Sequence, residues 1–295
     1  MRPPTIGRQA LLTAAAASLA AVNIRPAFSD AQTLSAKLAA RDAKLLTKPN
    51  GMLQPPEAAY PAWMEGEWMA SLSFAGYELP AKDAIPREQL FAEGNVPGFQ
   101  KCSLAFLPDV GKENVSFPLR WVRDKANVVR EDRVANLKAA VRGGLGYDAI
   151  DRVEYKADPM IPNPLGINPN RLSLVFAPGL TNNAERIELF VNSRETEQPS
   201  DDLFLMSEGL RQLTFSASTK AGVARQVNGE YCHYWTFRRL SETEVRANIL
   251  TAVYADALQL EKFFVKVGPN RPLILFSHGL RLVRPSVPET PSEAA

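Results

Sequence analysis

Short runs of alternating apolar and polar residues occupy most of the chain between residues 61 and 284. The first run places Trp68, Ala70, Leu72 and Phe74 on one side of an extended chain, with other residues between them. A period of two is typical of β-strands with one buried face. Further runs, rich in Val, Thr and aromatic residues, cover residues 116–122, 171–176, 186–195, 211–215, 223–239, 245–254 and 273–284.

The connections between these runs are short and rich in turn-forming residues, such as Pro178-Gly179, Ala221-Gly222 and Gly268-Pro269-Asn270. Roughly eight to ten sequential strands joined in this way favour an antiparallel up-and-down barrel, in which closure removes exposed strand edges. The pattern therefore predicts a mainly β domain over residues 61–284. A β-sandwich is the alternative.

Helical patterns are few and short. One is expected at residues 133–142, where Gly143 and Gly144 would stop it, and a second at residues 256–265. Residues 158–170 contain four prolines and are interpreted as a long irregular loop.

The flanks of the barrel have their own composition. Leu34, Leu38 and Leu45 recur at near-helical spacing, with basic residues such as Lys37 and Arg41 between them. Residues 30–60 are therefore interpreted as an amphipathic helix followed by a Pro- and Gly-rich linker. We expect this helix to pack on one end of the barrel rather than to lie on a membrane surface. Residues 285–295 hold three prolines and few apolar side chains, and they are expected to form a disordered tail.

Residues 1–29 have the pattern of an export signal. A cationic stretch, Met1–Gln9, precedes the apolar run Ala10–Val22, and Ala27 and Ser29 supply small residues before Asp30. The run has 13 residues, fewer than the roughly 20 that a membrane-spanning helix needs. We therefore expect a signal peptide that is removed near Asp30, and no transmembrane span in the mature protein.

Charge gives little support to a nucleic-acid partner. The chain has 34 Lys and Arg against 32 Asp and Glu, and residues 1–29 hold three arginines and no acid, which leaves 31 against 32 in the mature chain. A near-neutral balance excludes a strongly basic nucleic-acid binder.

Cysteine and histidine are too few for the common metal sites. The chain has two of each, so a four-cysteine zinc site and a disulfide-dense scaffold are excluded. His233 and His278 fall on different predicted strands, not on one zinc-binding helix. Cys102 and Cys232 are expected to be either bonded to each other in an oxidising compartment or both buried.

No enzyme motif is present in the sequence. Gly-x-Ser-x-Gly and the phosphate-binding Gly-x-x-x-x-Gly-Lys-Ser/Thr are both absent. The string Gly144-Leu-Gly146-Tyr-Asp-Ala149 follows a helical pattern rather than a strand, so it is interpreted as a turn. We therefore assign no catalytic residue, metal or cofactor.

A Gly-x-Trp sequence, Gly66-Glu-Trp68, opens the first predicted strand, and the last predicted strand carries arginines. This combination resembles the lipocalin and calycin superfamily. More narrowly, the span from about Pro61 to Arg284 is similar to an uncharacterised family of lipocalin-like proteins from cyanobacteria and plastids. The stretches that carry this similarity are residues 97–99, 131–136, 169–171, 183–186, 207–212 and 250–254.

The resemblance implies a setting but no activity. It points to photosynthetic membranes and the chloroplast thylakoid lumen. A nuclear-encoded lumen protein would carry a transit peptide before its signal peptide, and Met1–Gln9 is too short to serve as one. Another exported compartment is therefore the alternative location.

The first and last strands should be neighbours in a closed barrel. Trp68 shares its face with Ala70 and Leu72, so it should point inward near the start of the strand. We expect Trp68, next to Gly66, to cap one end of the barrel against Arg284, or against Arg281 if a bulge at Gly279 shifts the register.

Charged residues are frequent within the predicted strands. They either form ion pairs on a solvated outer face, or line a cavity that binds a carboxylate- or carbonyl-bearing ligand through arginine, with aromatic residues as its apolar part. The candidates for such a cavity are Phe190, Arg211, Phe215, Arg225, Tyr231, His233 and Trp235.

The expected fold and the family resemblance together imply a functional hypothesis. We expect a non-catalytic, lipocalin-like protein of the thylakoid lumen that binds a hydrophobic small molecule, such as a pigment or a lipid, or assists the assembly of a photosystem complex. The alternative is an enzyme built in the barrel cavity, such as an isomerase or a de-epoxidase. The interior volume separates these hypotheses, because a packed interior favours the assembly role.

Overall fold

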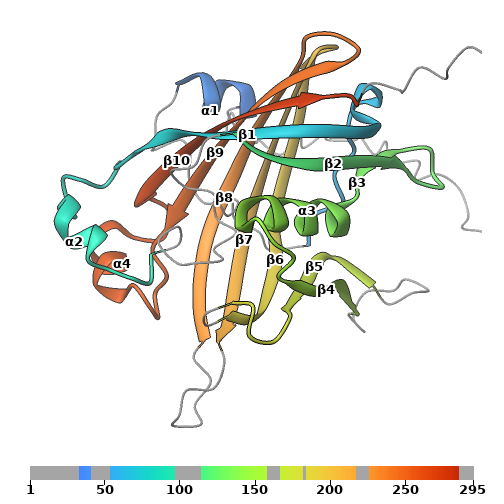
Figure 1. Cartoon of the computed structure of the whole chain (residues 1–295). Coiled ribbons are helices and arrows are strands. Elements are labelled where there is room, and N and C mark those ends of the chain that lie inside the picture. Colours follow the sequence, from blue (N-terminus) through green and yellow to red (C-terminus); the bar gives the residue numbers. More distant parts are fainter. Residues whose placement is uncertain are drawn as a thin grey trace, which may run out of the picture. The chain divides into compact units, whose positions relative to one another are not determined.

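The computed structural model describes residues 33–40, 54–96, 114–157, 167–181, 184–216 and 226–285. Within them, ten antiparallel strands form one sheet that curls into a half-barrel (Figure 1). The strands are β1 (Gly66–Glu78), β2 (Val115–Arg123), β3 (Val129–Glu131), β4 (Ile150–Ala157), β5 (Ile167–Phe176), β6 (Ala184–Ser200), β7 (Leu203–Ser216), β8 (Gln226–Arg239), β9 (Glu244–Tyr254) and β10 (Ile274–Val283). The mainly β, up-and-down architecture expected from the alternation is confirmed.

The strand order is β3-β2-β1-β10-β9-β8-β7-β6-β5-β4. The first and last long strands, β1 and β10, are neighbours, as expected. The edges of the sheet are β3 and β4, which do not pair with each other. The expected closed barrel is therefore corrected to an open one, with a gap between these two edges.

Helix α3 (Arg133–Leu145) follows β3, precedes β4 and contacts both β2 and β4, so it lies across this gap (Figure 1). The side chain of Asp132 accepts a hydrogen bond from Ala135 N, the usual device of a helix N-cap. The expected stop at Gly143 and Gly144 is wrong, because the helix continues to a cap at Gly146, with φ of 81°. Gly143 instead permits close packing, since a Cβ there would lie 3.0 Å from Phe117 Cβ.

The other helices are short. They are α1 (Leu34–Ala40), the 3-10 turn η1 (Ala62–Met64), α2 (Arg87–Phe91) and α4 (Glu261–Val267). The irregular loop expected at residues 158–170 is wrong for its last four residues, because β5 begins at Ile167; residues 158–166 lie outside the described part. The expected tail, apart from residue 285, and residues 1–29 also lie outside it.

Contacts between distant strands identify the concave face of the sheet. Trp121 on β2 and Phe237 on β8 are four strands apart in the sheet order, yet their ring centroids are 6.4 Å apart. Only a curled sheet brings such strands together, so these side chains lie on the inside of the curl. A large apolar core lies around them and includes Trp68, Met206 and Ala140 of α3.

Helix α1 covers the opposite, convex face. Leu34 packs in an apolar cluster with Leu205, Tyr234 and Tyr254, and Ser35 Oγ donates a hydrogen bond to Glu197 (2.6 Å). The expected packing of this helix on the sheet is present, although it rests on the sheet's face rather than on its end. Burial of Leu34 and these hydrogen bonds explain why seven residues hold a helix that would be too short to persist alone.

Cys232 lies in the same cluster as a buried free thiol. Burial raises the pKa of this thiol to about 12, so it stays protonated at neutral pH. Cys232 fits the burial alternative, whereas the disulfide alternative depends on Cys102 and stays a prediction. Cys102 lies outside the described residues.

The expected contact between Trp68 and an arginine of the final strand is present. The Trp68 side chain is 1% exposed, and the guanidinium carbon of Arg284 lies 4.2 Å from its ring centroid. Arg284 also donates to the carbonyls of Glu65 and Glu242, both at 2.9 Å. Gly66 has φ of 108°, and a Cβ there would lie 2.7 Å from Arg284 Nη1. The Gly-x-Trp sequence thus allows Arg284 to pack against both residues, since Gly66 leaves space for its guanidinium and Trp68 supplies the ring beneath it.

Arg281, the alternative partner, points elsewhere. Its side chain is 59% exposed and pairs with Glu244 at 2.8 Å. The register of β10 against β1 shifts between Phe74 and Gly76, not at Gly279, so Arg281 keeps its outward direction.

Candidate functional site

A cavity of about 90 Å³ lies on the concave face, between the sheet and α3, and it is partly open to solvent. Aromatic and aliphatic side chains form most of its wall. The lining residues are Tyr60, Phe117, Leu119, Trp121, Glu131, Arg133, Asn136, Leu137, Ala140, Leu189, Met206, Glu208, Leu210, Tyr231, His233, Trp235, Phe237 and Leu280.

Three of the cavity candidates expected from the sequence line this cavity. Tyr231, His233 and Trp235 alternate along β8, and all three face inward. His233 Nδ1 lies 2.8 Å from Thr251 Oγ1 on the neighbouring strand, and Tyr231 donates to Gln212 Oε1 (3.2 Å). These contacts fix the rings that form one side of the wall.

Among the described residues, the candidates Phe190, Arg211 and Phe215 do not line this cavity. Arg186 covers Phe215, with its guanidinium carbon 4.5 Å from the ring centroid, and Arg171 lies over Phe190 at 5.1 Å. Arg211 donates to Asn228. Phe190 and Arg211 lie on the convex face because their chain neighbours Leu189 and Leu210 take the inward positions. Phe215 shares the face of Arg211, since β7 runs without a register shift against β8. Arg225 lies outside the described residues.

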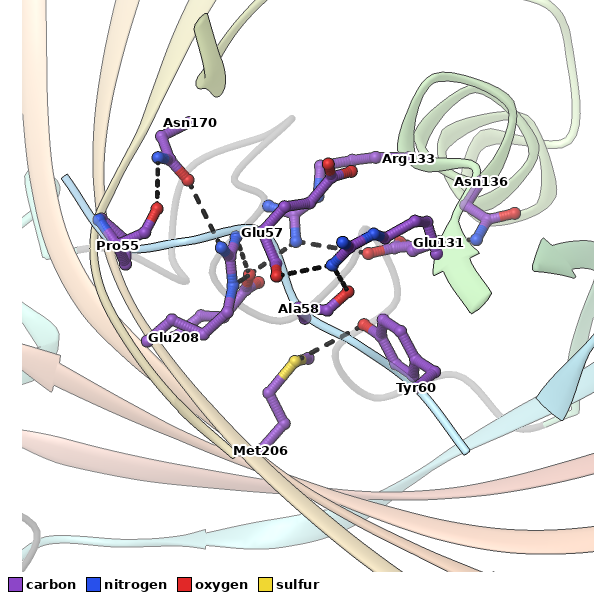
Figure 2. Close-up of polar contacts among 12 residues, drawn as sticks. Pro55, Glu57, Ala58, Tyr60, Glu131, Arg133, Asn136, Asn170, Met206 and Glu208 are labelled. Atoms are coloured by element: carbon purple, nitrogen blue, oxygen red, sulfur yellow. Dashed lines mark hydrogen bonds and ion pairs between the residues drawn. The ribbon is translucent and has the colours of Figure 1, made fainter. Parts of the chain in front are cut away.

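A buried charge cluster forms the polar part of the site, and sequence reasoning missed it (Figure 2). Glu208 Oε1 accepts from Arg133 Nη2 (2.6 Å) and from Arg194 Nε (2.8 Å). The side chains of Glu208, Arg133 and Arg194 are 6%, 11% and 4% exposed. Glu131 Oε2 lies 3.3 Å from Arg133 Nη2 and completes the cluster.

Three elements bring these side chains together. Glu208 occupies an inward position of β7, between Met206 and Leu210. Arg194 lies opposite Glu208 on β6, after a register shift between Val191 and Ser193 that re-aims the strand's side chains. Arg133 comes from the first turn of α3. One signal in the sequence could have indicated Glu208, namely a carboxylate on the apolar face of a strand.

The electrostatics of the cluster keep its charges fixed. Burial alone would raise the pKa of Glu208, but Arg133 and Arg194 outweigh it and lower that pKa to about 2. Burial, together with Glu131 and Glu208, raises the pKa of Tyr60 well above its ordinary value. Neither group therefore changes its protonation state near neutral pH.

A segment of chain, Gln54–Tyr60, crosses this site, and we call it the strap. Asn170 Nδ2 donates to Pro55 O (2.8 Å), Arg130 Nη1 donates to Glu57 O (2.7 Å), and Arg194 donates to Pro56 O. Tyr60 N donates to Val129 O (2.9 Å), which joins the strap to β3. The strap is thus tied to strands on both sides of the gap, and this part of the expected linker is packed structure.

A second, polar pocket of about 10 Å³ lies beside the strap. Tyr60, Glu131 and Arg133 line both this pocket and the larger cavity. Figure 2 shows Tyr60 directed at Met206, and its hydroxyl donates to that sulfur at 3.5 Å. The charge cluster therefore forms the wall between the apolar interior and the strap.

Acid is expected to weaken the fold through Glu208. Its pKa in the folded protein, about 2, lies below its ordinary value of 4.5. Ionised Glu208 therefore stabilises fully above pH 4.5, and this contribution is lost as the pH falls from 4.5 toward 2. Urea unfolding between about pH 7 and pH 3 should show a smaller loss of unfolding free energy in Glu208→Gln than in the unaltered protein. Equal losses would contradict this assignment.

The residues that the structure describes contain no group of three or more His, Cys, Asp and Glu side chains placed to hold a metal ion. Of the helices in this part of the chain, none has the length and apolar character needed to cross a membrane.

A curled antiparallel sheet with an apolar cavity on its concave face defines the class of barrel-like proteins with an interior site. Within that class, residues 53–286 match the family described as "Domain of unknown function (DUF6816)". The chain belongs to this family, and the match spans the strap and the whole sheet. No curated protein and no solved structure matches the chain.

Proposed function

We propose that this protein binds a small hydrophobic molecule in the concave cavity and does not act on it chemically. The observation that carries the proposal is the cavity wall, in which aromatic and aliphatic side chains surround a few polar groups. Such a composition is typical of ligand pockets in proteins. Apolar surface of a ligand would leave water on entering this site, which supplies the driving force.

The alternative, an enzyme built in the same cavity, has less support. An isomerase or de-epoxidase that moves protons needs an acid or base whose pKa lies near the working pH. Glu208 has a pKa of about 2, and the pKa of Tyr60 is raised well above its ordinary value. Neither Glu208 nor Tyr60 is therefore suited to exchanging protons near neutral pH.

The cavity volume limits the ligand. About 90 Å³ is small beside the roughly 300–1,000 Å³ of pockets that enclose drug-sized molecules. A whole pigment or lipid does not fit inside this volume, whereas a single ring, or the ring end of a longer molecule, is of the right order. Because the cavity is partly open to solvent, a longer ligand would extend outward from it.

The cellular setting is part of the proposal. We place the binding activity in the thylakoid lumen, or in another exported compartment, with a pigment- or lipid-derived molecule as the ligand. The export pattern of residues 1–29 and the resemblance to lumen-directed proteins support this setting. Assistance to a photosystem complex is the second role that the resemblance suggests.

Toluene, a hydrocarbon with a single ring, tests the binding proposal. We expect saturable shifts of cavity signals in two-dimensional NMR spectra of the full chain. Ala140→Leu should weaken toluene binding by about tenfold or more, because the added side chain fills space beneath α3. The matched control is Phe190→Leu on the convex face, which should bind toluene as the unaltered protein does. Absence of saturable binding, or equal binding in both variants, would contradict the proposal.

A further inference from the structure

The wall of the cavity carries a buried hydrogen-bond donor without an acceptor. Trp121 is 3% exposed and lines the cavity from β2, where its ring packs on Tyr60 with centroids 5.9 Å apart. Among the described residues, its indole Nε1 has no hydrogen-bond partner. A buried donor left in this state is costly, and native proteins rarely keep one without a reason.

The indole N–H groups of two other tryptophans have hydrogen-bond acceptors. Trp68 Nε1 donates to Met64 O at 2.8 Å, and Trp63 Nε1 donates to Asp201 O at 2.9 Å. The fold therefore supplies a backbone carbonyl to an indole N–H in both of these places. At Trp121 the ring faces the cavity, where an acceptor can come from a bound molecule.

The acceptors in the wall near Trp121 are carboxylates that are already paired with arginines. Glu208 Oε1 pairs with Arg133 and Arg194, and Glu131 Oε2 pairs with Arg133. Arg133 uses Nη2 for these pairs, and the hydroxyl of Tyr60 donates only to the weak acceptor Met206 Sδ. A ligand that complements this wall must bring a hydrogen-bond acceptor.

The net charge of the buried cluster favours an uncharged acceptor on the ligand over a carboxylate. Arg133 and Arg194 are matched by Glu131 and Glu208, so the cluster is neutral as a unit. A ligand carboxylate would place an additional, uncompensated negative charge in an apolar cavity, which is unfavourable. An uncharged carbonyl oxygen accepts the same hydrogen bond without that cost.

We propose that the cavity selects an uncharged carbonyl compound with one ring, whose oxygen accepts a hydrogen bond from Trp121 Nε1. This inference rests on the proposed binding function and names the chemical class of the ligand. The aromatic wall holds the ring, and the N–H of Trp121 sets its orientation. Selectivity arises because a hydrocarbon of the same shape leaves that donor unpaired.

Three probes with the same skeleton test this selectivity: acetophenone, α-methylstyrene and benzoate. α-Methylstyrene has C=CH₂ in place of the C=O of acetophenone. Benzoate has a negatively charged carboxylate in place of the acetyl group. NMR titration of the full chain would follow the Trp121 indole signal. We expect acetophenone to shift this signal and to bind about tenfold more tightly than α-methylstyrene, with benzoate the weakest.

The variant Trp121→Phe tests whether the preference for acetophenone depends on the indole Nε1 of Trp121. Trp121→Phe keeps an aromatic ring but removes the N–H, so acetophenone and α-methylstyrene should then bind with similar affinity. Trp63→Phe, which removes an indole outside the cavity lining, is the control and should retain the preference for acetophenone.

The outcomes separate the inference from the function beneath it. If α-methylstyrene binds as tightly as acetophenone, or if benzoate binds most tightly, the carbonyl inference is overturned while the binding function stands. A preference that survives in Trp121→Phe also overturns it. If none of the three probes binds, and toluene does not bind either, the binding function itself fails.

Discussion

Replacing Glu208 with glutamine is expected to lower the free energy of unfolding by about 3–5 kcal/mol. The substitution keeps the size of the side chain but removes its charge, and it leaves Arg133 and Arg194 buried around a neutral amide. A buried charge that loses its partner costs far more than the pair itself contributes. Urea unfolding at neutral pH, followed by circular dichroism, measures the change.

The matched control for this variant is Glu244→Gln. Glu244 pairs with Arg281 at 2.8 Å, much like the buried pairs in distance, but the Arg281 side chain is 59% exposed. Exposed ion pairs contribute about 0–1 kcal/mol, so the control should lose little stability. Similar losses in the two variants would show that burial of the cluster does not govern its energy.

Trp68→Ala is expected to destabilise the fold by about 3–5 kcal/mol. The change removes a large buried ring, the hydrogen bond from Nε1 to Met64 O and the surface on which Arg284 rests. Thermal or urea unfolding checks the loss. Since Trp68 does not line the cavity, the folded variant should still bind toluene.

Met69→Ala is the control for Trp68→Ala, because Met69 lies on the same strand with its side chain 47% exposed. A surface substitution of this kind should change the unfolding free energy by about 0.5 kcal/mol or less. Two results would contradict the account of Trp68: a loss no greater than that of the control, or selective loss of toluene binding in a fully folded variant.

The strands that could be predicted are those in which a stretch of unbroken alternation is long enough to show the period of two. β8 pairs with β7 and β9 without a register shift, so one parity from Tyr231 to Phe237 holds over the whole strand. β4 was missed because its register shifts between Ile150 and Arg152, which breaks the period that would have indicated it. β3 has only three residues, too few to show a period.

A site residue was predictable only where the local sequence pattern decides toward which face of the sheet its side chain points. Tyr231, His233 and Trp235 follow from the parity of one strand. Phe190 is as apolar as its inward neighbours Leu189 and Val191, and nothing local states which face of a strand becomes concave. Arg133 and Arg194 depend on where a helix crosses an open edge and on a bulge in β6, both set by tertiary packing.

The central claim is that the concave cavity is the binding site of this protein. A crystal structure of the full chain with acetophenone tests it most directly. The account predicts electron density for the ring between α3 and the sheet, with the carbonyl oxygen within hydrogen-bond distance of Trp121 Nε1. Acetophenone bound only elsewhere, or a cavity filled by the protein's own side chains, would contradict it.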